Sequence, residues 1–246
     1  MFNNIPTVTK NLLILNILFF AASLVMLQNG IDSMGILGGH YLNSPLFEPY
    51  QIVTHFFMHS PTDFFHILFN MIMLVMFGGH LERIWGPKRY FIFYIAAALG
   101  AFALYNSIGV FQIMELKSQI QLLGYDIYEL NDSILTQSNF EYNIDDKILL
   151  TQYASKIYTP MVGASGAIFG LMAAFAFLFP NTEMMLLFPP IPIKAKYLIG
   201  VYFLLEVYLS FQNKVGDNVA HIAHVGGAIV GFILVFIWNK KKDRFY

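Results

Sequence analysis

The sequence contains no cysteine, few charged residues and no basic stripe. Of its 246 residues, 12% are charged, whereas an average soluble domain carries about 25%. The absence of cysteine excludes a disulfide framework and thiolate chemistry. A net charge of −1 without a basic cluster excludes the electrostatic footprint of a nucleic-acid-binding protein. With 57% hydrophobic residues and a mean hydropathy of +0.59, the composition indicates a membrane protein.

The sequence is instead rich in long apolar runs. A helix needs about 20 apolar residues to cross a hydrocarbon core of about 30 Å. The first run could be a signal peptide, but no A-x-A cleavage site follows it, so we interpret it as a retained helix. We therefore predict an all-α membrane protein, a bundle of six transmembrane helices that forms one domain over 1–246. The predicted spans lie at about 11–29, 66–84, 89–112, 163–180, 195–212 and 219–239.

The basic residues predict the orientation of this bundle. If the N-terminus is cytoplasmic, ten of the fourteen Lys and Arg residues fall in cytoplasmic segments and the other four fall on the outer side. Cytoplasmic loops of membrane proteins carry such an excess of Lys and Arg. We therefore predict that both termini are cytoplasmic.

Two segments on the predicted outer side are not simple connections. The loop at 30–65, between the first two helices, is aromatic and proline-punctuated, and we expect it to be partly embedded in the membrane. The segment at 113–160 is acidic and is the most polar part of the chain. We expect it to form one or two short amphipathic helices on the outer surface, with Asn131 or Asp132 as an N-cap.

Ionisable and amide side chains inside spanning helices are costly, so each is a candidate functional residue. His66 and Asn70 lie four residues apart in the second span and therefore share a helix face. A lone buried histidine is more often structural than catalytic, and a single glutamate in a span is more often hydrogen-bonded structure than part of a proton or ion pathway. The other candidates lie in the fourth, fifth and sixth spans: Ser165, Glu206, His221 and His224.

A metal site is one alternative for the two neighbouring histidines, His221 and His224. Such a site needs three or four ligands. The sequence has no cysteine, no HExxH motif and no pair of carboxylates near them. We therefore expect no metal and no other cofactor.

Small residues accompany two of the polar side chains at similar positions. Ser165 begins the stretch SGAIFG, and His224 begins HVGGAIVG. Both stretches have a small-xxx-small face, which allows two helices to approach closely in lipid. If these faces meet, Ser165 and His224 lie at the same end of the contact. The glycines concerned are Gly166, Gly170, Gly227 and Gly231.

A serine beside a neutral imidazole is a nucleophile beside its general base. Phe169, one turn after Ser165, is placed to lie against the ring of His224. Asp217 precedes His224 by seven residues, which is an awkward reach for a third group. We therefore predict a Ser165–His224 dyad whose imidazole is oriented by packing.

Acyl transfer also needs hydrogen-bond donors for the developing oxyanion. The candidates are the amide of Asn70, the ring N–H of His66 and the backbone N–H of Ser165 at a helix start. Gly163 would allow the chain before the serine to approach a substrate carbonyl.

These motifs resemble those of the rhomboid family of intramembrane serine proteases. The G-x-S-G, AHxxGxxxG and HxxxN motifs of the family correspond to 163–166, 223–231 and 66–70, in the same order along the chain. The resemblance implies Ser165 as the nucleophile and His224 as the base. It also implies an oxyanion hole formed by His66, Asn70 and the Ser165 backbone.

The resemblance carries further implications. It selects His224 over His221, because only His224 has glycines at +3 and +7. It implies a bacterial-type six-span member in the bacterial inner membrane, with an active site that opens to the outer side and cleaves single-span membrane proteins. The chain departs from the family at Tyr50-Gln51, where some bacterial members have Trp-Arg, and at Phe169, where tyrosine is frequent.

Two other functions provide alternatives to the protease. A transporter or proton-coupled channel would use Glu206 and the histidines as its pathway, but the polar groups gather near one face and no inverted repeat is visible. A non-catalytic binder of transmembrane segments would need only the close helix packing.

Overall fold

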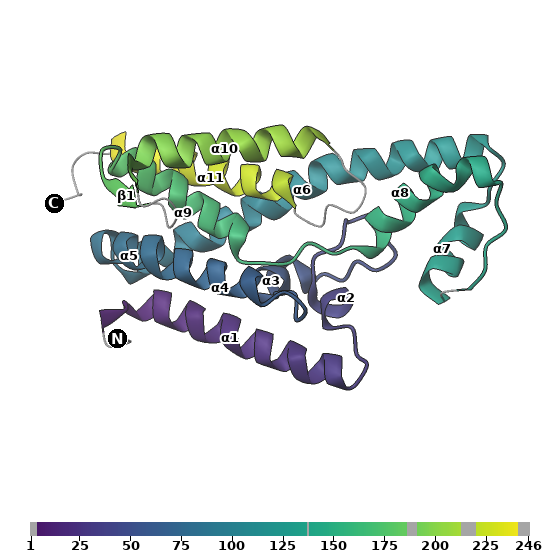
Figure 1. Ribbon diagram of the computed structural model, residues 1–246, viewed down its shortest axis with the longest axis horizontal. Coiled ribbons are helices and arrows are strands. Elements are labelled where there is room, and N and C mark those ends of the chain that lie inside the picture. The colour runs from purple at the N-terminus through teal and green to yellow at the C-terminus, as the bar shows by residue number, and fades with distance from the viewer. Residues whose placement is uncertain (1–3, 137, 186–190, 213–219, 241–246) are drawn as a thin grey trace.

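The computed structural model describes residues 4–136, 138–185, 191–212 and 220–240. Over these residues the chain is a bundle of helices with one small antiparallel hairpin (Figure 1). The second predicted span is one continuous helical segment, Phe64–Trp85, made of α4, the π-helical turn η3 and α5. The long elements are α1 (Thr7–Gln28), α4 (Phe64–Met73), η3 (Leu74–Gly78), α5 (Gly79–Trp85), α6 (Pro87–Leu122), α9 (Ser165–Leu178), α10 (Ala195–Gln212) and α11 (His221–Lys240).

Short elements connect the long helices. In the hairpin, Glu183 pairs with Lys194, and Met185 pairs with Pro192. The short elements are α2 (Ser33–Leu37), α3 (Gln51–Thr54), η2 (His55–Phe57), α7 (Ile127–Thr136), η4 (Ile144–Asp146), α8 (Lys147–Tyr158), β1 (Glu183–Met185) and β2 (Pro192–Lys194).

Within the described residues, four helical segments are long and apolar enough to cross a membrane. They are α1, the segment Phe64–Trp85, α6 and α11. Helix α9 is apolar but has only 14 residues, and α10 has 18. The predicted all-α membrane bundle is confirmed, and the count of six spans stays a prediction.

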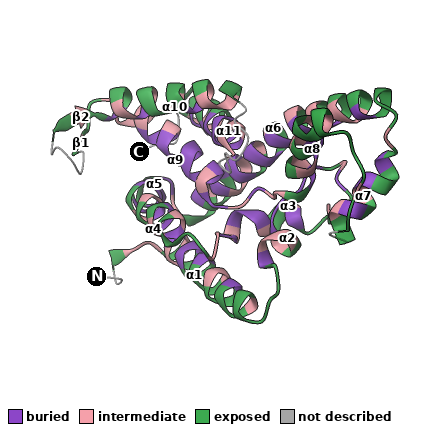
Figure 2. Cartoon of the chain, turned by 45° about the vertical axis from the view of Figure 1, so that its right-hand side comes forward, coloured by how far each residue is buried: buried purple, intermediate pink, exposed green. Residues whose placement is uncertain are grey.

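The centre of the bundle lies where α6, α9 and α11 meet. A methyl group on Gly227 would collide with the backbone carbonyl of Gly166, and one on Gly231 would lie 2.5 Å from the Cα of Gly170. Most of α9 is buried (Figure 2). Because glycine leaves no side chain between them, α9 and α11 pack backbone against backbone.

The start of α1 is capped by a side chain from another helix. Pro6 at the N-cap provides no side-chain hydrogen bond. The buried carboxylate of Glu82 in α5 instead accepts the backbone N–H groups of Val8 and Thr9 at 2.8 and 2.7 Å, and the Thr9 hydroxyl at 2.7 Å. Glu82 therefore satisfies donors that a helix start leaves unpaired, and it joins α1 to α5.

Helix ends meet at one end of the bundle. The ring of Trp85 at the end of α5 packs edge-on against Trp238 near the end of α11, with centroids 5.6 Å apart. The guanidinium of Arg83 donates to the carbonyl of Asn4, just before α1. The start of α1, the end of α5 and the end of α11 therefore lie on one side (Figure 1).

Helix α6 is longer than the predicted span, which was expected to end at 112. Its 36 residues correspond to about 54 Å of helix, well beyond the thickness of a hydrocarbon core. The continuation is helical because Ile113 and Ile120 are buried in one hydrophobic cluster with Tyr153 and Ile157 of α8. Helix α6 therefore continues into the predicted insertion at 113–160, and the end of the membrane span at about 112 stays a prediction.

One or two short helices were expected within 113–160, and this segment contains two, α7 and α8, which lie beyond the central bundle (Figure 1). The predicted N-cap is wrong, because Asn131 and Asp132 lie inside α7. Asp126 starts this helix instead. Its carboxylate accepts the Tyr128 N–H at 2.6 Å, and its carbonyl accepts the Leu130 N–H at 3.0 Å.

Candidate active site

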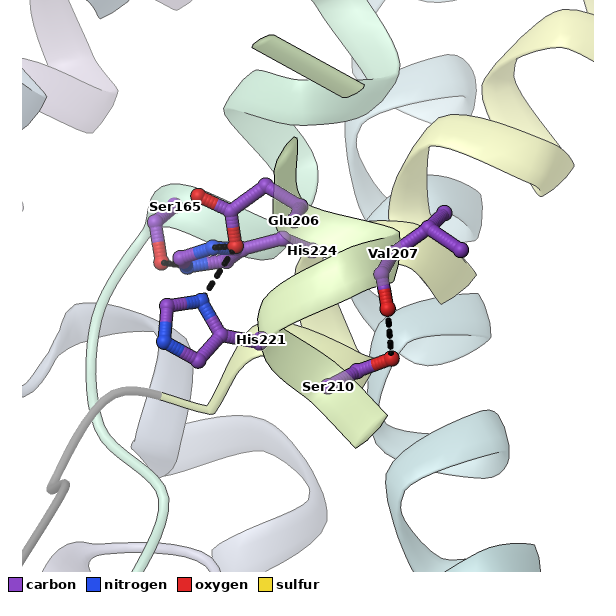
Figure 3. Close-up of polar contacts among 6 residues, drawn as sticks. All are labelled: Ser165, Glu206, Val207, Ser210, His221 and His224. Atoms are coloured by element: carbon purple, nitrogen blue, oxygen red, sulfur yellow. Dashed lines mark hydrogen bonds and ion pairs between the residues drawn. The ribbon is translucent and has the colours of Figure 1, made fainter. Parts of the chain in front are cut away.

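Ser165 and His224 lie side by side although 59 positions separate them. Ser165 is the first residue of α9, and His224 lies in the first turn of α11. The Ser165 Oγ is 2.8 Å from the His224 Nε2 (Figure 3). The contact exists because the glycine faces of α9 and α11 hold the two helix starts together. A serine hydroxyl at this distance can donate its proton to an unprotonated Nε2.

The plane of the His224 ring is set by Phe169. Phe169 lies one turn into α9, and its ring stacks on the imidazole with centroids 4.4 Å apart and planes 9° apart. Phe169 also packs against Tyr202 of α10, with ring centroids 5.2 Å apart. The stacking fixes the plane of the imidazole and leaves both nitrogens at its edges.

The second nitrogen of His224 has a carboxylate partner. Its Nδ1 lies 2.8 Å from Oε2 of Glu206, a buried residue of α10. The same Oε2 lies 2.6 Å from Nδ1 of His221 (Figure 3). Sequence reasoning flagged Glu206 as a costly buried residue but did not connect it with His224. Asp217, the carboxylate weighed from the sequence, lies outside the described residues.

Glu206, His221 and His224 also form the one cluster of potential metal ligands found in the described part of the chain, with ligand atoms within 4.8 Å of one another. A zinc ion bound by nitrogen and oxygen at about 2.0–2.2 Å would separate tetrahedral ligand atoms by roughly 3.3–3.6 Å. The two Nδ1–Oε2 distances, 2.6 and 2.8 Å, are shorter than that and are typical of charge-assisted hydrogen bonds.

The predicted oxyanion donors gather around Gly163. This residue has a φ of +119°, a conformation that favours glycine. A Cβ placed on it would lie 2.8 Å from Nε2 of His66 and 3.5 Å from Oγ of Ser165. The His66 ring and the serine therefore flank the same short piece of backbone. The backbone N–H of Ser165 lies at the start of α9, where the helix leaves such groups without an internal acceptor.

Asn70 lies one turn after His66 on the same face of α4. Its Nδ2 donates one hydrogen bond to the His66 carbonyl at 2.7 Å, and its Oδ1 has no partner among the described residues. An amide nitrogen has two N–H donors, so one remains for a ligand.

The loop at 30–65 supports the backbone before the serine. The His55 carbonyl accepts the Gly163 N–H at 3.0 Å, and Gly39 exchanges backbone hydrogen bonds with Met161. Gln51 is buried inside this loop. Its side chain accepts the N–H groups of His40 and Glu48 and donates to the carbonyls of Ile36 and Leu46.

Two histidines of this loop are buried in their neutral form. Burial lowers the pKa of His55 from 6.5 to about 4. Burial and the neighbouring ring of His66 lower the pKa of His59 from 6.5 to about 3. The charged form is disfavoured because desolvation penalises it.

The site opens into a cavity of about 850 Å³. Ser165, His224, His66 and Asn70 all line it. The remaining wall is mainly apolar and aromatic and includes Phe65, Phe69, Met73 and Met172. The cavity therefore joins a small polar group to a large apolar surface, which is typical of a binding site.

Comparisons with known proteins agree with the motifs. A profile of the family described as Rhomboid domain matches residues 46–114 and 144–241, which is more than half of the chain. RHOMBOID-like protein 12, mitochondrial, of Arabidopsis thaliana is 28% identical over 198 residues, 80% of this chain and 48% of that protein. Putative rhomboid protease YdcA of Bacillus subtilis is 26% identical over 201 residues, 81% of this chain and 72% of that protein.

A third relative has a named protease activity. Rhomboid protease AarA of Providencia stuartii is 27% identical over 177 residues, 69% of this chain and 49% of that protein. The chain thus spans about half the length of the Arabidopsis and Providencia relatives. The family resemblance read from the motifs is confirmed.

Proposed function

The chain belongs to the rhomboid family, and on this premise we propose that it is an intramembrane serine endopeptidase. The observation that carries the proposal is the 2.8 Å contact between Ser165 Oγ and His224 Nε2, in a cavity with an apolar wall. A membrane helix offers no acceptor for a serine hydroxyl except its own backbone or a polar neighbour. Here the neighbour is a base.

The reaction uses the pair in two steps. As Ser165 Oγ attacks the carbonyl carbon of a substrate peptide bond, His224 Nε2 takes the hydroxyl proton and then gives it to the leaving nitrogen. The C–N bond breaks and an acyl-serine remains. In the second step, His224 takes a proton from water, the hydroxide attacks the acyl carbon, and Ser165 regains its proton as the acid product leaves.

The negative charge of each tetrahedral intermediate falls on the former carbonyl oxygen. The donors proposed for it are the ring N–H of His66, the free amide N–H of Asn70 and the backbone N–H of Ser165. Loss of one such donor typically costs about 2.7–4 kcal/mol of transition-state stabilisation. The positive φ of Gly163 supports this assignment, because a side chain there would occupy the space beside His66.

The proposed substrates are single-span membrane proteins, cleaved near the outer end of their helix. The apolar wall of the cavity suits an unwound piece of a transmembrane segment, whose side chains are apolar and whose carbonyls are polar. We propose one domain over 1–246, in which 113–160 is an outer insertion. The family profile leaves 115–143 unmatched, which supports the insertion.

The proposed orientation places both termini in the cytoplasm and the active site toward the outer side. The start of α1 and the end of α11 lie at the same end of the bundle, and the starts of α4, α9 and α11, which provide the site, lie at the other. The relatives are bacterial proteins and proteins named mitochondrial. We propose the bacterial inner membrane, which fractionation of the native host tests.

A fluorophosphonate probe, which forms a covalent adduct with an activated serine, tests the proposal directly. The full-length protein in detergent micelles should label, and Ser165→Ala and His224→Ala should not. Ser210→Ala provides the matched control, because this serine lies in α10 and, among the described residues, donates to the Val207 carbonyl. His221→Ala should still label, though more slowly, because Ser165 and His224 remain in place while Glu206 loses one donor. Wild-type protein that fails to label, or a Ser165→Ala variant that labels, would contradict the proposal.

A second assay separates cleavage from the two alternatives. A single-span protein reconstituted with the enzyme in liposomes should be cut by wild-type protein and remain intact with Ser165→Ala. Binding of this protein without cleavage would identify a non-catalytic binder of transmembrane segments. Ion or proton flux across the same liposomes without cleavage would identify a transporter or channel.

A further inference from the structure

We propose that Glu206 is a positioning residue that holds His224 in the tautomer required of a general base. The proposed dyad thereby becomes a hydrogen-bonded triad of Ser165, His224 and Glu206. The inference rests on the proposed function for its effect on catalysis. Its structural part, the control of the His224 tautomer, can be measured whether or not the protein is a protease.

Burial of a carboxylate in an apolar helix costs free energy, so the position of Glu206 indicates a function for it. It lies in the apolar helix α10 and is only 3% exposed. Within the predicted spans, only Glu82 and Glu206 are acidic. Glu82 caps α1, which accounts for its burial. Glu206 makes its described hydrogen bonds to the two histidines at the start of α11 and to no helix end.

The tautomer follows from the chemistry of the partners. An ionised carboxylate can only accept hydrogen bonds, so the His224 nitrogen that lies 2.8 Å from Oε2 must carry a proton. In a neutral imidazole the other nitrogen is then unprotonated. That nitrogen is Nε2, which faces Ser165 Oγ. The carboxylate thus leaves a lone pair where the serine proton must go.

The carboxylate also faces the charge that forms during the reaction. When His224 takes the serine proton it becomes an imidazolium, and Oε2 of Glu206 is the anionic atom beside it. An opposite charge at hydrogen-bond distance in a low-dielectric site stabilises that state. Phe169 fixes the plane of the ring, and Glu206 fixes which of its two edges carries the proton.

His221 holds the carboxylate in place. Its Nδ1 donates to the same Oε2 at 2.6 Å, from the turn before His224. A buried carboxylate needs such donors, because an unsatisfied charge in an apolar site is strongly unfavourable. The two histidines thus have different functions. His224 acts on the serine, and His221 supports Glu206.

The test uses full-length protein with isotope-labelled histidine and four variants. Glu206→Leu removes the acceptor but suits an apolar helix, and Glu206→Asp keeps a carboxylate. Ser210→Ala, one turn further along α10, is the control. Nitrogen NMR distinguishes an Nδ1–H from an Nε2–H imidazole, and the spectrum of His224→Gln identifies the His224 signals. Fluorophosphonate labelling rates are measured on the same samples.

We expect wild-type His224 to carry its proton on Nδ1, and Glu206→Leu to shift it toward Nε2. The labelling rate of Glu206→Leu should fall by on the order of 10⁴-fold, as kcat does when the carboxylate of a serine protease triad is removed. Glu206→Asp should restore at least part of this rate, and Ser210→Ala should match wild type. Cleavage assays should show the loss in kcat, not in KM, since Glu206 touches no substrate.

Two results would overturn the inference. One is an Nε2–H tautomer in wild-type protein, which would exclude the proposed bond. The other is a Glu206→Leu variant that is folded, keeps the Nδ1–H tautomer and labels within about threefold of wild type. If wild-type protein does not label at all, the proposed protease function fails while the NMR comparison still decides the function of Glu206.

Discussion

The imidazole of His224 lies flat on the ring of Phe169, with planes 9° apart and centroids 4.4 Å apart. This contact prevents the imidazole from tilting. Within its plane, the ring is held by the contacts of its two nitrogens with Ser165 and Glu206. The orientation of the proposed base therefore depends on one aromatic residue of the nucleophile's own helix. Such stacked geometry is a favoured arrangement of aromatic rings.

Replacement of Phe169 by leucine should lower kcat for a single-span substrate by about 10- to 100-fold, because small misplacements of a reacting group cost that much. Phe169→Tyr keeps the flat ring and should remain close to wild type. Phe177→Leu is the control, since Phe177 lies in the same helix but packs against Phe232. If Phe169→Leu equals Phe177→Leu in kcat, stacking does not position the base.

Substitution of Gly227 tests the close approach of α9 and α11. Gly227→Ala should lower both the unfolding temperature and the probe labelling rate, because the added methyl group meets the Gly166 carbonyl and must push the helices apart. Gly200→Ala is matched to it, since Gly200 lies in α10 with open space around it. It should be as stable as wild type. Equal unfolding temperatures for the two variants would argue against a tight α9–α11 contact.

The capping of α1 by Glu82 predicts a stability effect without a catalytic one. Glu82→Ala should reduce the free energy of unfolding by about 2–5 kcal/mol, because three hydrogen bonds to the carboxylate are lost, at about 1.5–3 kcal/mol each less what water replaces. The exposed Glu129→Ala is the control. Reversible unfolding in mixed micelles measures the difference. A Glu82→Ala variant as stable as Glu129→Ala would show that the cap contributes nothing.

The buried histidines of the loop at 30–65 predict sensitivity to acid. The pKa values of His55 and His59 are about 4 and about 3 in the folded chain, below the ordinary 6.5. Below pH about 6.5 the unfolded chain therefore binds more protons, and the free energy of unfolding falls as the pH falls. Each unit of pKa difference corresponds to about 1.4 kcal/mol at most.

Thermal unfolding of the protein in detergent between about pH 7.5 and 4.5 measures this slope. His59→Leu should flatten it, because it removes one buried group that must be neutral. His80→Leu, which replaces an exposed histidine outside this loop, is the control. Stability that rises toward acid pH in wild-type protein would be incompatible with neutral burial of these rings.

Much of the fold follows from apolar runs in the sequence. The predicted span at 195–212 coincides with α10, and the span at 219–239 corresponds to α11 (His221–Lys240). The end of α6 was not predictable in this way. The residues after 112 are polar on one face, and their helix is stabilised by burial of Ile113 and Ile120 against α8, a contact between distant segments.

The candidate site, like the fold, could be predicted from the sequence only in part. Glycine spacing after Ser165 and His224 predicts that their helices pack closely, because spacing along one helix defines a face. The partner of His224 could not be found from spacing. Glu206 is 18 positions away, on a different helix, and its contact depends on how α10 is rotated against α11. Its cost as a carboxylate in an apolar helix was the signal that a partner exists.

The separation of Ser165 and His224 along the chain determines when the site can form during synthesis. Ser165 leaves the ribosome well before α11 has been made, and its partner histidine arrives only with the last described helix. Until α11 inserts and docks its glycine face on α9, the serine has no base beside it. Under the proposed mechanism, a chain whose α11 has not yet docked on α9 therefore lacks its general base and cannot cleave a substrate.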